Sequence, residues 1–186
     1  PALPATFDRI IDGDTVRLGG APFRVIAGFG HSPEHAALHD AARGVLISGD
    51  MLLPRISTNI SAWPGEPDGD PLARFLDSLS RFEDLAPDTL VLPSHGLPFR
   101  GIALRVAQLR AHHDARLAEL EEFIRRAQAP VSAADVLPTL FRRELDLQQR
   151  FFAMGEAIAH LNHLWHRGRA ERIVDAHRAV LFRAMP

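Results

Sequence analysis

The sequence predicts an α+β fold, with short strands concentrated in residues 1–100 and helices in residues 101–186. Up to about residue 63, short apolar runs alternate with turn residues such as Gly19-Gly20, which is typical of β-strands. From residue 102 onward, apolar residues recur at three- and four-residue steps, the period of an amphipathic helix. The chain has 186 residues and is 46% hydrophobic, so it can bury a core.

The expected strands come first along the chain. Apolar runs at 7–11 and 15–18 flank Asp12-Gly13, and Asp-Gly between two such runs indicates a β-hairpin. A further strand is expected after Gly19-Gly20, at residues 23–28. The same reasoning predicts strands at residues 35–39, 45–48 and 89–92.

The expected helices begin at recognisable caps. Asp70 followed by Pro71 predicts a helix start, because an Asp side chain caps free backbone N–H groups and Pro suits the first helical position. A long helix is expected from residue 102 to about 127, and Ser132 caps a short helix that runs to residue 141. Residues 144–165 hold one or two further helices, and residues 170–174 and 179–182 suggest a small hairpin. Three helices followed by a hairpin form a winged-helix-like order.

Three short polar segments lie where strand-like runs end. They are Gly30-His31-Ser32-Pro33-Glu34-His35, Ser48-Gly49-Asp50 and Pro93-Ser94-His95-Gly96. Loops at strand ends commonly carry functional side chains on a rigid frame, and imidazole and carboxylate groups suit divalent metals. We therefore interpret His31, Asp50 and His95 as candidate metal ligands at one edge of a sheet.

This ordered trio resembles the later ligand motifs of the metallo-β-lactamase-fold hydrolases, in a glyoxalase-II-like, β-lactamase-like branch. The resemblance covers residues 1–100 as the second half of an αββα sandwich, and residues 101–186 resemble the helical C-terminal extension of that branch. It implies that His31 binds one metal, His95 the other, and that Asp50 bridges both and is the catalytic carboxylate. His35 is expected to support these ligands by hydrogen bonding rather than to bind metal.

The same resemblance implies a dinuclear centre, with zinc as the most frequent metal and iron or manganese as alternatives. Two cations that share a water would lower its pKa and so favour hydrolysis of an ester, thioester, lactone or amide in a small acyl substrate. The His-x-His-x-Asp-His motif that opens the family is not found in this sequence. We therefore expect the C-terminal portion of a hydrolase, inactive until a missing N-terminal half or a second copy of the chain completes it.

The composition limits the kinds of partner and metal ligand that we expect for this chain. The formal net charge is -2, and all 21 basic residues are Arg, so bulk charge does not favour nucleic acid. The chain contains no Cys, which leaves His and carboxylates as metal donors. No apolar run approaches the roughly 20 residues of a membrane span, and we expect a cytoplasmic protein without membrane contact.

Several other residues admit a simpler interpretation. His113 falls within the apolar stripe of the long helix and is expected to be buried or half-buried. His160, His163 and His166 rotate by about 60° per three-residue step around a helix, which disfavours a common metal site. An alternative hypothesis is a noncatalytic module that binds protein or nucleic acid through the winged-helix-like tail, with Arg167, Arg169 and Arg172 as contacts.

Overall fold

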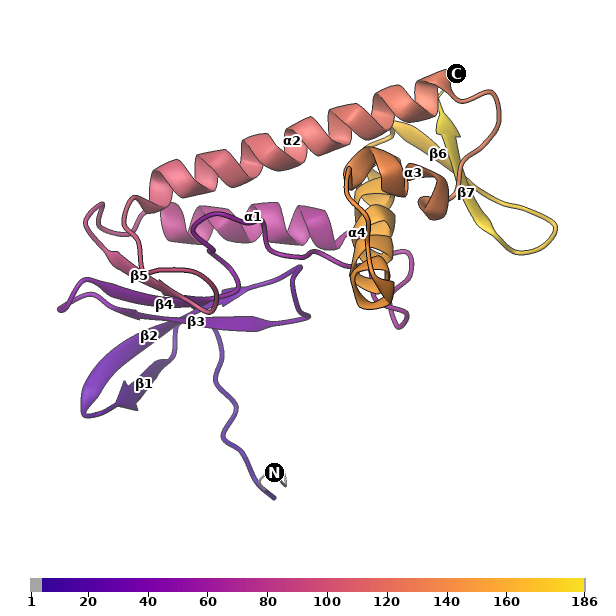
Figure 1. The fold of residues 1–186 in the computed structure, drawn as a ribbon. Helices are drawn as coiled ribbons and strands as arrows, with labels where there is room; N and C mark the ends of the chain where they lie inside the picture. Colours follow the sequence, from indigo (N-terminus) through magenta and orange to yellow (C-terminus); the bar gives the residue numbers. More distant parts are fainter. Residues whose placement is uncertain (1–4, 186) are drawn as a thin grey trace.

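The computed structural model describes residues 5–185, which form a five-stranded sheet with helices on one side and a hairpin beyond them (Figure 1). The strand order is β1-β2-β3-β4-β5; β1 to β4 pair antiparallel, and β5 pairs parallel to β4. The parallel pair brings the ends of β4 and β5 to the same edge of the sheet. The strands are β1 (Thr15–Leu18), β2 (Ala21–Gly28), β3 (His35–Asp40), β4 (Val45–Gly49) and β5 (Leu90–Pro93).

Four helices follow or interrupt the strands. Helix α1 (Pro71–Glu83) lies between the sheet and α2 (Ile102–Arg126), and α2 runs from the sheet to the terminal hairpin (Figure 1). The expected caps are present, since the side chain of Asp70 accepts a hydrogen bond from Ala73 N–H and that of Ser132 accepts one from Asp135 N–H. The remaining elements are α3 (Ala133–Leu140), α4 (Leu147–His166), β6 (Ala170–Val174) and β7 (Val180–Ala184).

The core lies between the sheet and the helices. Ile26 pairs with Ala37 and Leu46 pairs with Val91, and all four side chains are buried on the face that α1 covers. This cluster continues through α2 and α4 to Phe182 of the hairpin, so the core crosses the predicted domain boundary at residue 100. Burial of this apolar surface is the main force that holds α1 and α2 on the sheet.

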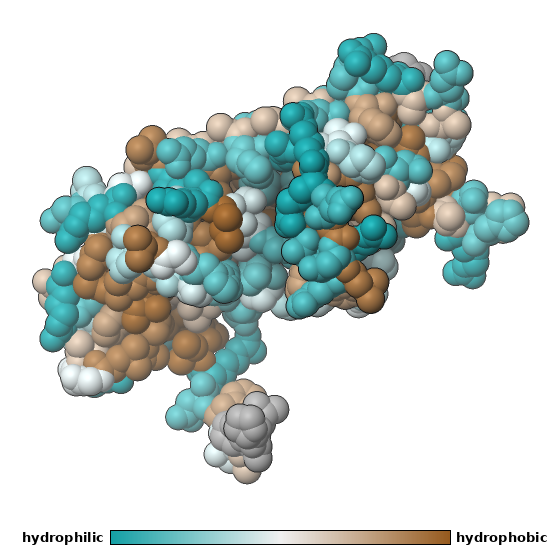
Figure 2. Space-filling view, viewed as in Figure 1, coloured by the Kyte–Doolittle hydropathy of each residue, from teal (hydrophilic) through white to brown (hydrophobic). Residues whose placement is uncertain are grey.

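The opposite face of the sheet carries a second apolar row. Val25, Leu38, Ile47 and Leu92 pair across four successive strands, and the last three are only half-buried. Helices α1 and α2 lie over the other face of the sheet, α3 and α4 lie beyond its end (Figure 1), and Figure 2 shows hydrophobic residues gathered over the sheet surface. An apolar row of this kind favours association with a further layer.

The N-terminal hairpin was predicted in the wrong place. Residues 7–11 form no strand, and Phe7 is 85% exposed, whereas β1 pairs with β2 across Gly19-Gly20. The Asp12 carboxylate accepts a hydrogen bond from Ala27 N–H, and Gly13 N–H donates to the carbonyl of Val25. These bonds use the Asp-Gly pair to extend the contact with β2, so the pair does not reverse the chain into a preceding strand.

The C-terminal region has the predicted order of three helices and a hairpin. Residues 144–165, expected to hold one or two helices, contain the single helix α4, which is capped by Asp146. The winged-helix description stays a prediction, as does the division of the chain at residue 100. Among residues 5–185, no helix combines the length and apolar character needed to cross a bilayer.

Candidate metal centre

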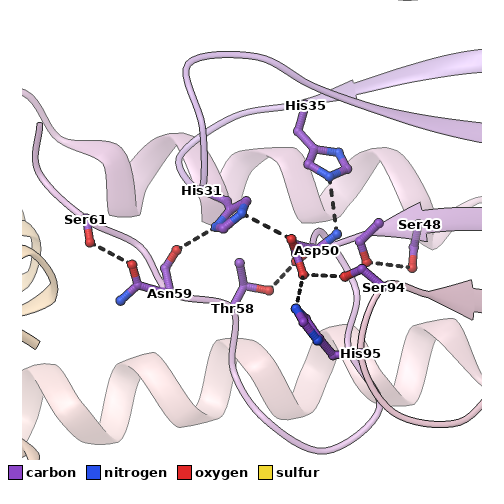
Figure 3. A network of polar contacts seen from close by, with 10 residues as sticks. His31, His35, Ser48, Asp50, Thr58, Asn59, Ser61, Ser94 and His95 are labelled. Carbon is purple, nitrogen blue, oxygen red and sulfur yellow. Dashed lines mark hydrogen bonds and ion pairs between the residues drawn. The ribbon is translucent and has the colours of Figure 1, made fainter. Parts of the chain in front are cut away.

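Two of the predicted ligands, His31 and His95, face the carboxylate of the third, Asp50 (Figure 3). His31 Nε2 lies 3.4 Å from Asp50 Oδ2, and His95 Nε2 lies 3.6 Å from Asp50 Oδ1. Each imidazole therefore faces a different oxygen of Asp50. The Asp50 carboxylate lies between the two rings, as a group shared by two cations would.

His31 is oriented by a backbone carbonyl. It sits in the loop that follows β2, and its Nδ1 lies 2.9 Å from the carbonyl oxygen of Asn59. A carbonyl only accepts hydrogen bonds, so Nδ1 carries a proton, and in the neutral form of the ring Nε2 is then the nitrogen with a free lone pair, directed toward Asp50. An unprotonated imidazole nitrogen is the form that binds a metal.

Asp50 is held from several sides at the end of β4. Its backbone N–H donates to His35 Nε2 at 3.2 Å, its carbonyl accepts from Thr58 Oγ1, and its Oδ1 accepts from the Ser94 hydroxyl. Gly49 precedes it with a φ of +53°, and a Cβ there would lie 2.4 Å from the His35 ring. Glycine at this position thus lets His35 reach the Asp50 backbone.

His35 lies behind Asp50 rather than beside the two facing imidazoles. Burial, with a smaller effect from His31, lowers the pKa of His35, so its ring is neutral at physiological pH. Its Nε2 accepts the Asp50 N–H bond, and its Nδ1 is buried with no hydrogen-bond partner in the part of the chain that the structure describes. This is where a supporting residue would lie, and that role stays a prediction.

His95 is the most accessible of the three. It follows β5, its side chain is 68% exposed, and that of Asp50 is 27% exposed. The turn that carries His95 is tied to β4 because Ser94 N–H donates to the Gly49 carbonyl at 3.1 Å. Parallel pairing of β4 and β5 thus places His95 opposite Asp50.

The donor chemistry fits divalent metals, but the number of donors falls short. A neutral Nε2 and a carboxylate oxygen both carry lone pairs that repel each other, and a cation bound between them would remove this repulsion. The spacing also fits, because two ligands of one tetrahedral zinc lie about 3.3–3.5 Å apart. Among residues 5–185, no group of three or more His, Asp or Glu side chains is placed to hold one ion. The structure thus offers two donors to each of two ions, whereas catalytic zinc normally has three protein ligands.

Sequence reasoning missed three polar residues around these ligands. Ser94 directly precedes the candidate ligand His95 in the segment Pro93-Ser94-His95-Gly96, and a hydroxyl at that position is a signal in the sequence for its contact with Asp50. Thr58 and Asn59 lie in a segment without periodicity, and their contacts to Asp50 and His31 depend on how that segment crosses the sheet edge.

The other histidines have separate partners. His113 is fully buried, as predicted, and its Nδ1 lies 3.2 Å from His160 Nε2. His163 Nδ1 lies 3.0 Å from Asp70 Oδ1, and His166 Nε2 contacts the Asp68 carbonyl. These contacts join α4 to α2 and to the loop before α1.

A mostly apolar pocket of about 530 Å³ adjoins His95. Arg105 fixes one wall, because its guanidinium donates to the carbonyls of Leu53 and Ile56 at 2.6 and 2.8 Å. The pocket is lined by Pro54, Arg55, Ile56, His95, Gly96, Leu97, Pro98 and Phe99. It could hold an apolar group next to the facing imidazole and carboxylate.

Comparison with known proteins identifies the family of this fold. The family described as "Metallo-beta-lactamase superfamily" matches residues 3–95, and "Metallo-beta-lactamase-like, C-terminal domain" matches residues 117–185. The chain therefore belongs to the metallo-β-lactamase superfamily, and the resemblance inferred from the three motifs is confirmed.

Two solved structures resemble the chain over nearly its whole length. The crystal structure of a beta-lactamase domain protein from Burkholderia ambifaria has a TM-score of 0.92 and 54% sequence identity, covering 100% of this chain and 54% of that chain. A metallo-beta-lactamase family protein from Thermus thermophilus has a TM-score of 0.85 and 30% identity, covering 98% and 56%.

Curated relatives are similar at lower coverage. "Probable metallo-hydrolase YqjP" of Bacillus subtilis (strain 168) is 30% identical over 137 residues, covering 72% of this chain and 41% of that protein. "Hydroxyacylglutathione hydrolase" of Erythrobacter litoralis (strain HTCC2594) is 30% identical over 139 residues, covering 74% and 51%. The chain thus spans about half the length of the relatives it matches.

Proposed function

We propose that this chain supplies the shared carboxylate and one histidine per ion to a dinuclear metal centre that hydrolyses acyl compounds. The single observation that carries the proposal is the placement of two imidazole nitrogens 3.4 and 3.6 Å from the two oxygens of Asp50. Membership of a superfamily with relatives named hydrolases supports the reaction type.

The residues of the site would have distinct roles. His31 and His95 would each hold one divalent cation, zinc first and iron or manganese as alternatives, and Asp50 would hold both. Bound cations would supply a water of lowered pKa and an electrophile for the carbonyl oxygen. The Asn59 carbonyl keeps the proton of His31 on Nδ1, and Ser94 and His35 hold the carboxylate and backbone of Asp50.

The substrate is proposed to be a small ester, thioester, lactone or amide. The pocket beside His95 would take its apolar part, with the exposed Arg55 at the pocket wall available to an anionic group. Burial of an apolar acyl group against Ile56 and Leu97 would hold the scissile carbonyl near the site.

The remaining donors are proposed to come from outside this chain. Each ion has two donors here and needs at least one more, and the half-buried apolar row Leu38, Ile47 and Leu92 offers a surface for a second layer. The N-terminal half of the sandwich, or a second copy of the chain, would supply both. On this proposal the chain is inactive by itself.

The noncatalytic alternative draws less support from the structure. Arg169 forms an ion pair with Glu121, and Arg172 pairs with Asp68 and lies over the Trp165 ring. These contacts partly neutralise two of the three arginines that a nucleic-acid surface would use. We interpret the winged-helix-like tail as part of the hydrolase.

The test is elemental analysis and hydrolysis by the protein encoded by the complete gene. Two metal equivalents and turnover of at least one ester, thioester, lactone or amide are expected, and Asp50→Asn should lose both. Asp88→Asn, at an exposed carboxylate before the start of β5, whereas His95 follows the end of that strand, is the matched control. A metal-loaded, folded protein that hydrolyses none of these acyl classes would reject the proposal.

A further inference from the structure

Helix α4 contacts the segment that orients His31. The Asn59 side-chain amide donates to Glu156 Oε2 at 3.2 Å and lies 3.5 Å from the Phe152 carbonyl. The backbones are also joined directly, because Ala62 N–H donates a hydrogen bond to the Gly155 carbonyl of α4 at 3.0 Å. Residues 59–62 are therefore joined to the tail by hydrogen bonds that span more than ninety positions of sequence.

The Asn59 side chain has one favoured orientation. The Phe152 carbonyl can only accept a hydrogen bond, so the NH₂ group of Asn59 faces α4 and Glu156. The amide oxygen Oδ1 is then left to accept from the Ser61 hydroxyl at 2.7 Å (Figure 3). With both ends of the amide bound, the peptide unit of Asn59 cannot rotate freely. Its backbone carbonyl accepts the hydrogen bond from His31 Nδ1–H.

The packing at this junction tolerates little displacement. A Cβ on Gly155 would lie 2.6 Å from the Ser61 hydroxyl oxygen, so α4 approaches the segment as closely as a glycine permits. Burial raises the pKa of Glu156 to about 7. Either protonation state leaves an oxygen that can accept from the Asn59 amide.

We propose that Glu156 and Asn59 are positioning residues through which α4 holds the metal-binding nitrogen of His31 toward Asp50. The metal-dependent part of this inference rests on the proposed function, whereas the orientation of His31 does not. On this proposal α4 has a defined role at the site, because it fixes the tautomer and orientation of His31 without contacting metal or substrate.

The first experiment reads the tautomer of His31 directly in the metal-free protein. Long-range ¹H–¹⁵N correlation spectra at pH 8.5, where free imidazole is neutral, distinguish a protonated Nδ1 from a protonated Nε2. The wild-type protein should show the Nδ1–H form at His31. Glu156→Ala and Asn59→Ala should shift His31 toward a mixture of the two forms, because the Asn59 carbonyl loses its fixed position.

Matched variants separate positioning from general disruption. Glu156→Gln keeps a side-chain oxygen that accepts from Asn59 and should restore the wild-type tautomer. Gln148→Ala removes an exposed side chain of the same helix and should leave His31 unchanged. The His35 signals report on folding at the site, since α4 makes no hydrogen bond to that ring among residues 5–185.

The second readout is metal affinity in the protein encoded by the complete gene, titrated with Zn²⁺ alone. Loss of a hydrogen bond that orients a metal-binding histidine typically weakens binding 10- to 100-fold, and about 10-fold is expected for Glu156→Ala. A tautomer change without any hydrolytic activity would support the positioning role while rejecting the proposed function. An unchanged His31 tautomer in folded Glu156→Ala and Asn59→Ala would overturn the positioning role.

Discussion

The buried pair His113 and His160 should make the protein sensitive to acid. His160 Nδ1 lies 2.8 Å from the Glu156 carbonyl, so it carries a proton, and its Nε2 accepts from His113 Nδ1–H. The remaining nitrogen, His113 Nε2, is buried with no partner among the described residues, near the Phe75 ring. Protonation of either ring would place a cation in this apolar interior.

The magnitude follows from the shifted pKa values. Burial lowers the pKa of His113 to about 3 and that of His160 to about 4, from an ordinary value of 6.5. Because both folded-state pKa values are depressed, the associated stability is present above pH 6.5 and is lost as the pH falls toward 3. Between pH 8 and pH 5, the protonation of each histidine should lower the free energy of unfolding by about 2 kcal/mol. The reason is that pH 5 lies roughly 1.5 units below the unfolded-state pKa, and each unit is worth about 1.36 kcal/mol.

The assay is urea unfolding followed by circular dichroism at pH 8, 7, 6 and 5. His113→Leu should start from a lower free energy of unfolding at pH 8, because the His160 acceptor loses its donor. Its free energy should then fall by about 2 kcal/mol less than that of the wild type between pH 8 and pH 5. His177→Gln, at an exposed hairpin position, is the control and should parallel the wild type. Parallel curves for His113→Leu and wild type would refute the reasoning.

Three further predictions concern other parts of the molecule. In the protein encoded by the complete gene, Asp50→Asn should reduce hydrolysis about 100-fold or more, which corresponds to about 3 kcal/mol of lost transition-state stabilisation, with metal content measured in parallel; retained metal and full activity would exclude a shared-ligand role. Burial raises the pKa of Glu156 from 4.5 to about 7, so its contribution is present below pH 4.5 and lost as the pH rises through 7. In urea unfolding, the free energy of unfolding of wild type should therefore fall by up to about 3 kcal/mol more than that of Glu156→Gln as the pH rises from 4 to 8. An equal change in both proteins would contradict this. Asp70→Ala removes the cap of α1 and the contact to His163, which should cost about 1–2 kcal/mol and lower Tm by several degrees; an unchanged Tm in thermal unfolding would show that neither contact stabilises the fold.

Local patterns predicted most elements because their causes are local. Two helices could be predicted from local features alone, independent of the tertiary contacts. One begins at Asp70 and Pro71, and the other shows the helical spacing of Val106, Leu109, Leu117 and Leu120. The same reasoning failed at residues 7–11, where an apolar run next to Asp-Gly forms no strand. Asp12 instead binds the Ala27 backbone, a contact that no periodicity describes.

The candidate ligands were accessible from the sequence for a different reason. His31, Asp50 and His95 each end a strand-like run, and their order matches a known family, so their identity did not require coordinates. Which nitrogen of His31 faces Asp50 did require them, because the Asn59 carbonyl that decides it lies 28 positions away. The links from Asn59 to Glu156 and from His113 to His160 join still more distant positions.

The amino-acid sequence alone determined the types of the donors, their places at strand ends and the helical character of the tail, because chemistry and periodicity act over a few residues. Only the tertiary structure decided that the two imidazoles face opposite oxygens of one carboxylate, and that α4 holds the segment behind His31. These arrangements depend on how the sheet edge and the core bring distant segments together, which is a property of packing rather than of any local pattern.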